Sequence, residues 1–339
     1  MLRTASFSGQ VGLITILEAW EEAKLDKADP SRIGLVIGGS NFQQRDMVQM
    51  HEAYADRVHF VRPTYGLTFM DSDLVGLCTE QFGIKGISYT LGGASASGQL
   101  AIIQAIQAVQ SGQVDICIAM GALMDVSYWE CQAFRSLGAM GSDRFADEPE
   151  KACRPFDRER DGFIYGESCG AVVIERTESA ISRQITPYAI ITGWAVGMDA
   201  SRNPHPSYEG EVQVIKKALE QAKLSPHQID YVNPHGTGSL VGDEIEIKAI
   251  VDCQLSNAAI NATKSITGHG LSSSGAVEVI ATLLQMKESR LHPTRNLESP
   301  IEESCNWVRD QSITHHVKHA LSLNIGFGGI NTAICFYKI

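Results

Sequence analysis

One stretch of the chain joins a short strand, a glycine-rich turn and an apolar helix with no linker between them. Residues 86–91 have a strand pattern, Gly92 and Gly93 form the turn, and Ser95 stands just before a run of helix formers that begins at Leu100. A side chain placed where a strand turns into a helix lies among unpaired backbone N–H groups, at the positive end of the helix dipole. Enzymes hold nucleophiles and oxyanions at such positions, although a serine there is also an ordinary helix N-cap.

A fainter copy of this arrangement follows in the second half. A strand over residues 259–264 leads into Ser-Ile-Thr-Gly-His269-Gly and then into a helix over residues 274–289. If the copy is a true duplication, each helix lies at the centre of its half and points its N-terminus at a shared site. The pattern then predicts a duplicated, five-layered α/β fold. Strand–turn–helix units also recur in α/β proteins that are not duplicated, so the pattern alone leaves that alternative open.

The rest of the chain alternates short β-branched runs with amphipathic helices, which is typical of α/β layering. We expect strands at residues 33–39, 86–91, 114–120, 170–175, 185–196, 229–234, 259–264, 321–325 and 332–337. We expect helices at residues 9–25, 67–81, 95–111, 211–223, 241–251 and 274–289.

Composition excludes several classes of protein. No apolar run reaches the eighteen or so residues of a membrane span, and a net charge of −11 argues against nucleic acid as the main partner. The eight cysteines are scattered without a CxxC pair, which favours reduced thiols in a cytoplasmic protein and no metal site. Local basic patches could still dock an acidic protein partner.

Four segments carry polar residues between glycines or at the ends of strands. They are Arg154-Pro-Phe-Asp-Arg-Glu-Arg-Asp-Gly-Phe, Asn233-Pro-His235-Gly-Thr237-Gly-Ser239, Thr263-Lys264-Ser-Ile-Thr-Gly-His269, and Asn324-Ile-Gly-Phe327-Gly-Gly-Ile-Asn331. A single histidine beside glycine is usually a turn residue. Two such histidines at equivalent strand ends, with a lysine between strand and turn, indicate a catalytic site.

With these motifs in this order, nearly the whole chain, from about residue 5 to residue 339, resembles the β-ketoacyl synthases of the thiolase-fold condensing enzymes. The resemblance implies a thiolase-like αβαβα fold, with residues 1–180 as the half that carries Ser95 and residues 181–339 as the half that carries the histidines. The family begins with a further strand and a glycine-rich turn. Neither is found ahead of the helix at residues 9–25, so we expect the first half to have one edge strand fewer.

The resemblance also implies roles for individual residues. Ser95 stands where the family has its nucleophilic cysteine, His235 and His269 match the catalytic histidines, and Lys264 matches a lysine that supports the second of them. Among substrate-binding residues, Phe327 matches a gating phenylalanine, Thr237 and Ser239 match hydroxyls that contact the phosphopantetheine arm, and Asn331 ends the last motif. Arg154 is expected near the face that docks the carrier protein, or in an internal salt bridge to the acidic run at residues 157–161. Glu167 and Glu278 are expected to be buried structural carboxylates.

Serine in place of the nucleophilic cysteine is the departure that matters most. Condensation needs a thiolate to accept the acyl chain, and a thiol with a pKa near 8.5 can supply one at a helix N-terminus. An alcohol is far weaker and needs an adjacent base. Decarboxylation of a malonyl thioester needs no nucleophile, only donors aimed at the carbonyl oxygen where enolate charge develops. Together with a serine at position 95, the resemblance implies a malonyl-acyl-carrier-protein decarboxylase of the kind that serves β-branching in bacterial polyketide pathways.

Three alternatives stay open at this stage. Ser95 could be a true nucleophile in an acyltransferase or hydrolase, since Gly93-Ala-Ser95-Ala-Ser97 comes close to the GxSxG elbow. The chain could be a non-catalytic partner of an active ketosynthase, although such partners tend to lose the histidines. It could also be an ordinary β-ketoacyl synthase trapped by a Cys→Ser change. The resemblance implies a homodimer joined through the edges of its sheets, and no metal or tightly bound organic cofactor.

Overall fold

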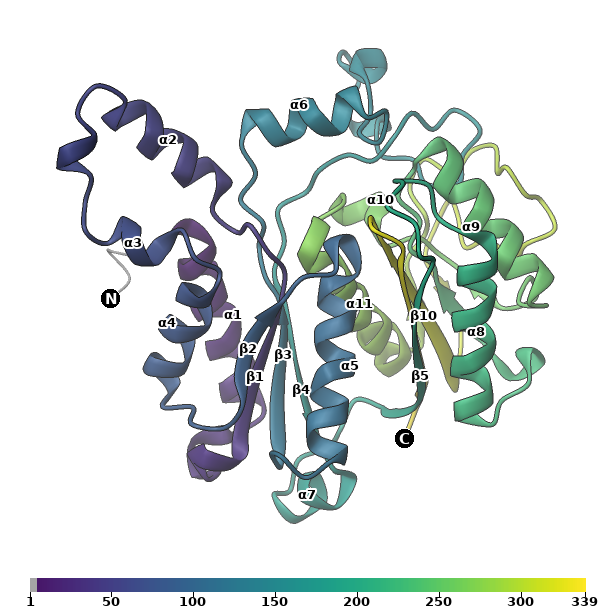
Figure 1. The fold of residues 1–339 in the computed structure, drawn as a ribbon. Coiled ribbons are helices and arrows are strands. Elements are labelled where there is room, and N and C mark those ends of the chain that lie inside the picture. The colour runs from purple at the N-terminus through teal and green to yellow at the C-terminus, as the bar shows by residue number, and fades with distance from the viewer. Residues whose placement is uncertain (1–4) are drawn as a thin grey trace.

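A computed structural model describes residues 5–339 of the chain. Two mixed sheets stand back to back in it, with helices between them and on both outer faces (Figure 1). The first sheet contains β1 (Ile33–Gly38), β2 (Ser88–Leu91), β3 (Ile116–Gly121) and β4 (Gly170–Glu175). The second contains β5 (Ile190–Met198), β6 (Tyr231–Asn233), β7 (Ala259–Ile260), β10 (His319–Gly326) and β11 (Ile330–Tyr337), and a small hairpin pairs β8 (Arg290–Leu291) with β9 (Ile313–Thr314).

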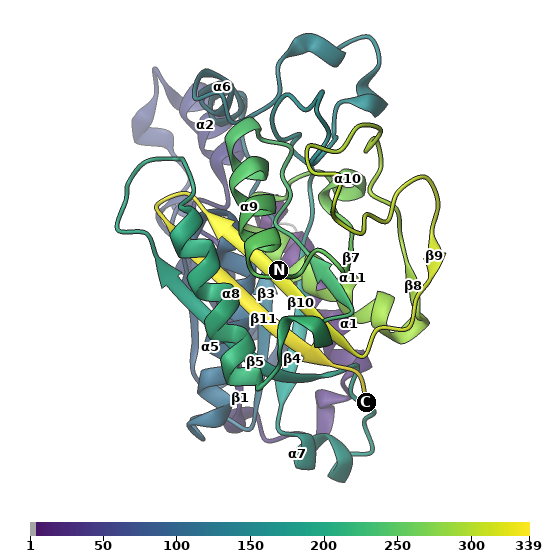
Figure 2. The ribbon, with the colours of Figure 1, turned by 90° about the vertical axis from the view of Figure 1, so that its right-hand side faces the viewer.

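The helices make up the other three layers. They are α1 (Phe7–Glu22), α2 (Gln44–Tyr54), α3 (Tyr65–Thr68), α4 (Ser72–Phe82), α5 (Ser97–Gln110), α6 (Tyr128–Ser136), α7 (Thr177–Ser182), α8 (Tyr208–Ala222), α9 (Leu240–Asp252), α10 (Lys264–Thr267) and α11 (Ser274–Glu288). Helices α1 and α4 cover the outer face of the first sheet, α8 lies on the second sheet with α9 beside it, and α5 and α11 pack between the sheets (Figures 1 and 2). The expected αβαβα layering is confirmed.

The sheets share one strand order and direction, which supports the duplication suggested by the sequence. The first sheet runs β2-β1-β3-β4 and the second runs β7-β6-β10-β11-β5. In each sheet three neighbouring strands are parallel and the next one is antiparallel. Only the second sheet has a fifth strand, β5, paired beyond its antiparallel strand. Within residues 5–339, the matching position beside β4 holds no strand, as expected for the first half.

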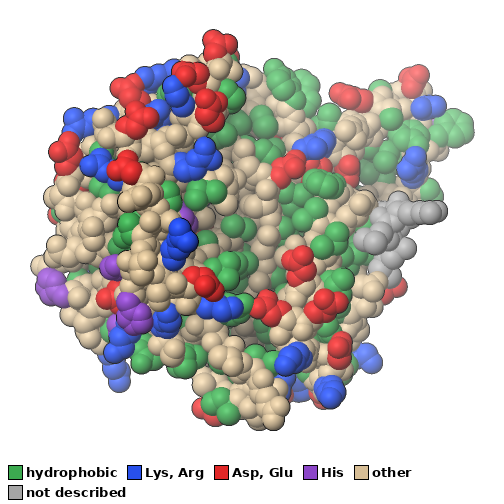
Figure 3. Space-filling view, turned by 180° about the vertical axis from the view of Figure 1, so that it is seen from behind, with side chains coloured by type: hydrophobic (Ala, Val, Ile, Leu, Met, Phe, Trp, Pro, Cys, Tyr) green, Lys and Arg blue, Asp and Glu red, His purple; other side chains and the backbone are tan. Residues whose placement is uncertain are grey.

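Hydrophobic side chains form a separate layer on each side of each sheet. The central layer joins α5 and α11 to the inner faces of both sheets, around residues such as Ile102, Val279 and Ile334, all less than 1% exposed. Two further clusters lie under α1 and α4 and under α8 and α9. The rear face of the molecule mixes acidic and basic groups with scattered hydrophobic side chains (Figure 3). None of the helices in residues 5–339 has the length and hydropathy to cross a membrane.

Several expected boundaries were wrong. The helix expected over residues 67–81 is broken between α3 and α4, and the strand expected over residues 259–264 ends at Ile260, so Lys264 instead begins α10. Helices α2 and α6 had no expected counterpart. Both carry mostly polar sequences, and none of their residues is fully buried, so their hydrophobic periodicity is weak.

Helices α5 and α11 cross at glycines. A Cβ atom on Gly98 would lie 2.7 Å from the backbone nitrogen of Ala276, and one on Gly275 would lie 2.6 Å from the backbone nitrogen of Gln99. Both clashes involve backbone atoms, which cannot move aside as a side-chain tip can. Side chains larger than hydrogen at either position would therefore push the two central helices apart.

We expect Gly98→Ala to lower the free energy of unfolding by about 1–3 kcal/mol, the usual cost of overpacking a core. Gly76 is a matched control because it lies inside α4 with no atom within 4 Å of its would-be Cβ. Gly76→Ala is expected to stabilise the protein by about 0.5–1 kcal/mol. Denaturant unfolding measures both values, and equal effects at the two positions would contradict the close crossing.

A buried carboxylate in α8 makes the stability of the fold depend on pH. Glu211 is 1% exposed, and neither of its carboxylate oxygens has a hydrogen-bond partner within residues 5–339. Burial, together with the nearby charges of Glu246 and Asp199, raises the pKa of Glu211 well above its ordinary value of 4.5. A group whose pKa is raised by folding stabilises the protein at low pH, and this contribution is lost as the pH rises through the raised pKa.

Glu211→Gln keeps the shape of the side chain and removes its charge. We expect it to raise the free energy of unfolding at pH 8 by about 1–2 kcal/mol and to make the decline in stability between about pH 5 and pH 8 smaller. Glu209→Gln, at an exposed position in the same turn of α8, should leave the profile unchanged. A wild-type stability that does not fall over this range would contradict the buried, unpaired acid.

Candidate active site

Ser95 and His269 meet at the point where the two central helices begin. Each helix starts from a short 3-10 turn, Ala94–Ala96 before α5 and Leu271–Ser273 before α11. The first residue of each turn has a left-handed backbone, with φ 47° at Ala94 and 54° at Leu271. These sharp turns lift the two functional side chains into one space, where Ser95 Oγ lies 2.9 Å from His269 Nε2.

The second histidine comes from the loop after β6. The His235 ring packs edge-on against that of His269, with centroids 5.5 Å apart. Both rings are buried, at 8% and 3% exposed. The backbone N–H groups of His235 and Gly236 donate to the carboxyl group of Glu246, which fixes the loop against α9.

Both histidines are held neutral. Burial lowers the pKa of His235 and that of His269 well below the usual 6.5, and the positive charge of Lys264 lowers both further. A neutral imidazole has one ring nitrogen that donates and one that accepts. The hydrogen-bond partner of one ring nitrogen therefore shows which of the two nitrogens carries the proton.

Lys264 contacts His235, not His269. Its Nζ lies 3.2 Å from His235 Nδ1 and also donates to the His235 carbonyl oxygen and to Glu278. The expectation that Lys264 orients the second histidine is therefore wrong, because α10 turns the lysine toward the first. An ammonium group only donates, so Nδ1 of His235 accepts and its Nε2 carries the proton.

Glu278, in α11, is the counter-ion of this lysine. Both side chains are 1% exposed, and the second carboxylate oxygen of Glu278 accepts from Asn324 Nδ2. Burial raises the pKa of Glu278 to about 7, against the opposing pull of Lys264. The expected structural pairing of Glu278 with Lys264 is confirmed. Glu167, by contrast, has a half-exposed side chain that pairs with Arg45, so the expectation that it is buried was wrong.

A cavity of about 360 Å³ opens onto these side chains. Ser95, His235 and His269 line it together with Thr237, Ser239 and Phe327, so the structure brings six of the expected site residues to one space. The aromatic rings of Phe134 and Phe163, to which the sequence assigned no role, also line it. Among the described residues that line this cavity there is no cysteine.

Two expected site residues lie elsewhere. Asn331 is fully buried, and its amide donates to Asp199, so it supports the loop after β5 and does not line the cavity. Arg154 is 5% exposed and pairs with Asp157. The alternative of an internal salt bridge is therefore confirmed for Arg154, and an exposed docking role is wrong because its guanidinium is not at the surface.

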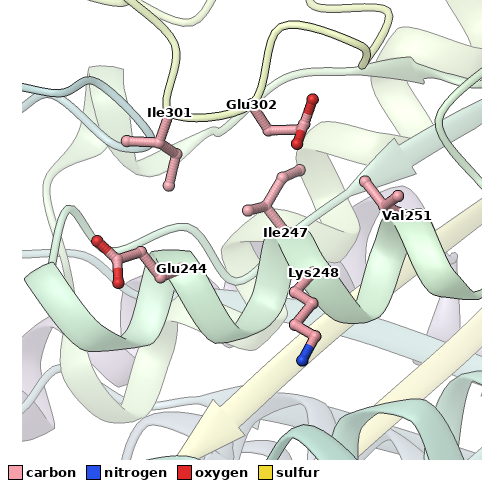
Figure 4. A pocket seen from close by; sticks show the side chains of 6 residues that line it. All are labelled: Glu244, Ile247, Lys248, Val251, Ile301 and Glu302. Carbon is pink, nitrogen blue, oxygen red and sulfur yellow. The ribbon is translucent and has the colours of Figure 1, made fainter.

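A smaller hollow lies on the outer side of α9 (Figure 4). One face of the helix contributes Glu244, Ile247, Lys248 and Val251, and the loop at Ile301 and Glu302 forms the other wall. It has no histidine, serine or cysteine. The candidate catalytic side chains line the larger cavity instead.

Comparison with known proteins agrees with this geometry. Residues 2–180 match the family described as beta-ketoacyl synthase, N-terminal domain, and residues 188–298 match the beta-ketoacyl synthase, C-terminal domain. The chain is 65% identical over its whole length to the polyketide biosynthesis malonyl-ACP decarboxylase PksF of Bacillus subtilis (strain 168), of which it covers 82%. It is 33% identical to 3-oxoacyl-[acyl-carrier-protein] synthase 1 of Buchnera aphidicola, over 98% of this chain and 82% of that protein.

Solved structures show the same fold. A beta-ketoacyl synthase from Burkholderia phymatum superposes with a TM-score of 0.91 at 27% identity, over 99% of this chain and 83% of that one. A type II polyketide ketosynthase, solved with its acyl-carrier protein, superposes with a TM-score of 0.91 at 25% identity, over 97% of this chain and 84% of that one. The chain belongs to the β-ketoacyl synthase family.

Proposed function

We infer that this chain decarboxylates malonyl-acyl carrier protein to acetyl-acyl carrier protein in bacterial polyketide biosynthesis, where it supplies acetyl units for β-branching. The observation that carries this proposal is the pair of neutral, buried imidazoles beside an alcohol in place of a thiol. The relative of 65% identity is described as a malonyl-ACP decarboxylase, which supports the same reaction.

The reaction breaks the bond between the malonyl methylene carbon and its carboxylate carbon. Carbon dioxide leaves, and the electron pair spreads over the methylene carbon and the thioester carbonyl oxygen as an enolate. The methylene carbon then takes a proton to give the acetyl thioester. The barrier falls if donors already point at the oxygen where negative charge develops.

His235 and His269 fit this donor role. Both open onto the same cavity, and Lys264 leaves His235 with its proton on Nε2. Burial keeps both rings neutral, so each ring has one N–H to donate. We propose that the thioester carbonyl oxygen binds between the two Nε2 atoms, near the position of Ser95 Oγ.

Thr237, Ser239 and Phe327 lie where the rest of the substrate would pass. All three line the cavity, and Thr237 Oγ1 accepts from the backbone N–H of Ser239, which orders the loop. Phe327 is 39% exposed and its ring lies 6.4 Å from that of Phe134. We propose that the two hydroxyls contact the phosphopantetheine arm and that Phe327 gates the cavity.

A serine nucleophile is the competing function, and the 2.9 Å contact between Ser95 and His269 is the observation in its favour. The low pKa of His269 argues against it, because a base that resists protonation gains little by taking the serine proton. No carboxylate bonds to the far side of the ring within residues 5–339. Its Nδ1 instead meets the hydroxyl of Ser274.

Variants at Ser95 and at the two histidines distinguish decarboxylation from acyl transfer. With malonyl-acyl carrier protein as substrate, we expect His235→Ala and His269→Ala each to lower the rate of carbon dioxide release about 10²–10³-fold, the usual cost of losing one oxyanion donor. Ser95→Ala should stay within about tenfold of wild type, since no covalent bond forms at this position. His316→Ala, at an exposed position, is the control.

Mass spectrometry of the protein and of the carrier completes this experiment. The wild type should yield acetyl-carrier protein with no acyl group on Ser95, and Ser95→Cys should gain an acyl thioester. A stable ester on wild-type Ser95 would support the nucleophile alternative. A wild type that neither releases carbon dioxide nor takes up an acyl group would support a non-catalytic partner, and one that made a longer ketoacyl product would end the decarboxylase proposal.

We propose that the chain acts as two thiolase-like halves, residues 1–180 and 181–339, and assembles as a homodimer through β2. The boundaries fit the matched family segments and the two sheets. Strand β2 is an edge strand with half-buried residues. The carbonyls of Ile87 and Leu91 accept from Leu35 in β1 and from Gly39 just after it, so the alternation of a strand turns the backbone groups of Thr90 outward.

The dimer has a direct test in solution. Light scattering should give the wild type twice the mass of one chain. Thr90→Pro removes an outward N–H and should yield monomers, whereas Thr90→Val keeps that N–H and should not. A monomeric wild type would contradict the assembly.

A further inference from the structure

Ser274 contacts Nδ1 of His269, the counterpart of the His235 nitrogen that Lys264 contacts. It is the first residue of α11 and is 3% exposed. Its Oγ lies 2.8 Å from His269 Nδ1, and this is the only hydrogen bond that the structure gives this hydroxyl within residues 5–339. Two hydrogen bonds therefore connect Ser95, the His269 ring and Ser274 in a row.

The two possible ring tautomers of His269 have opposite consequences. With the proton on Nε2, His269 is a donor toward the cavity and can stabilise an enolate oxygen. With the proton on Nδ1, Nε2 accepts, and His269 becomes a base that could activate Ser95 as a nucleophile. The partner at Nδ1 therefore decides which reaction this ring supports.

Hydrogen-bond accounting favours the proton on Nε2. A hydroxyl has one proton to donate. If Nδ1 carried the ring proton and donated to Ser274, the proton of Ser274 would be buried with no acceptor among the described residues, which is unfavourable. If Ser274 donates to Nδ1, its proton is satisfied. The hydroxyl of Ser95 then accepts from Nε2 and can donate into the cavity, because Ser95 is only partly buried.

We propose that Ser274 is a positioning residue that fixes His269 as the Nε2–H tautomer, so that the ring donates to the enolate and does not activate Ser95. This inference rests on the proposed decarboxylation for its kinetic consequence, but the tautomer itself is a property of the free protein. Lys264 does the same for His235. The two donors are thus set by two different residues, one charged and one neutral.

Nuclear magnetic resonance of the protein labelled with ¹⁵N in its histidine rings tests the tautomer without any substrate. The long-range ¹H–¹⁵N spectrum distinguishes a protonated from an unprotonated ring nitrogen, and the missing signals in His269→Gln assign the ring. We expect wild-type His269 to have its proton on Nε2 at neutral pH. A proton on Nδ1 would overturn the proposal, whatever the activity of the protein.

Kinetics with malonyl-acyl carrier protein test the consequence. We expect Ser274→Ala to lower kcat for carbon dioxide release about tenfold with KM little changed, because the donor acts mainly on the developing charge. The His269 ring signals of Ser274→Ala should show a mixture of the two tautomers. Ser274→Thr, which keeps a hydroxyl, should restore most of the rate and the single tautomer.

Ser273→Ala is the matched control. Ser273 is the neighbouring buried serine, but its hydroxyl bonds to the Gly270 carbonyl and to Ser168. Its loss should change kcat by less than about twofold. Equal losses in the two alanine variants, or an unchanged rate in Ser274→Ala, would overturn the proposal. If the wild type released no carbon dioxide, the proposed function would fail, and the ring spectrum would still decide the tautomer.

Discussion

The close crossing of α5 and α11 is the constraint on which the active site depends. Gly98 and Gly275 let the backbones of the two helices approach closely. Each helix is preceded by a 3-10 turn whose first residue, Ala94 or Leu271, has a left-handed backbone. Because the crossing lies within the first turns of both helices, it fixes the distance between their N-termini. Ser95 and His269 meet for this reason, although 174 positions separate them along the chain.

A buried ion pair beside this site influences the protonation state of its two histidines. Lys264 and Glu278 are both removed from water, and a buried pair of this kind is costly unless further hydrogen bonds satisfy it. The His235 ring and carbonyl, together with Asn324, supply those bonds. The same cation disfavours a second positive charge nearby, which is one reason that both histidines stay neutral.

Much of this arrangement could be predicted from the sequence. The strand patterns located β1, β3 and β4 to within two residues at each end, since runs rich in Val and Ile are typical of strands. The strand–turn–helix pattern singled out Ser95, and two glycine-containing motifs singled out His235 and His269, which line the same cavity. The recurrence of a strand, a turn and a helix also anticipated the duplication that the two sheets confirm.

What the sequence could not give was the partner of each polar group. The resemblance implied that Lys264 supports His269, but the short helix α10 directs the lysine to His235. The resemblance placed Asn331 among the substrate-binding residues and left Arg154 open between carrier docking and an internal salt bridge, and both side chains are buried in structural contacts. Ser274 looked like an ordinary helix start. Such assignments depend on tertiary contacts that no local pattern encodes.

The replacement of a thiol by an alcohol changes less in this cavity than it would in a hydrolase. A cysteine at a helix N-terminus ionises readily, so acyl transfer there depends mainly on the helix and on the thiol itself. An alcohol does not ionise near neutral pH and depends on a neighbouring base. The nearest imidazole has a depressed pKa and meets a hydroxyl, not a carboxylate, at Nδ1. On the proposed mechanism, the site therefore has no strong nucleophile, while the two imidazoles that would donate to an enolate line the cavity.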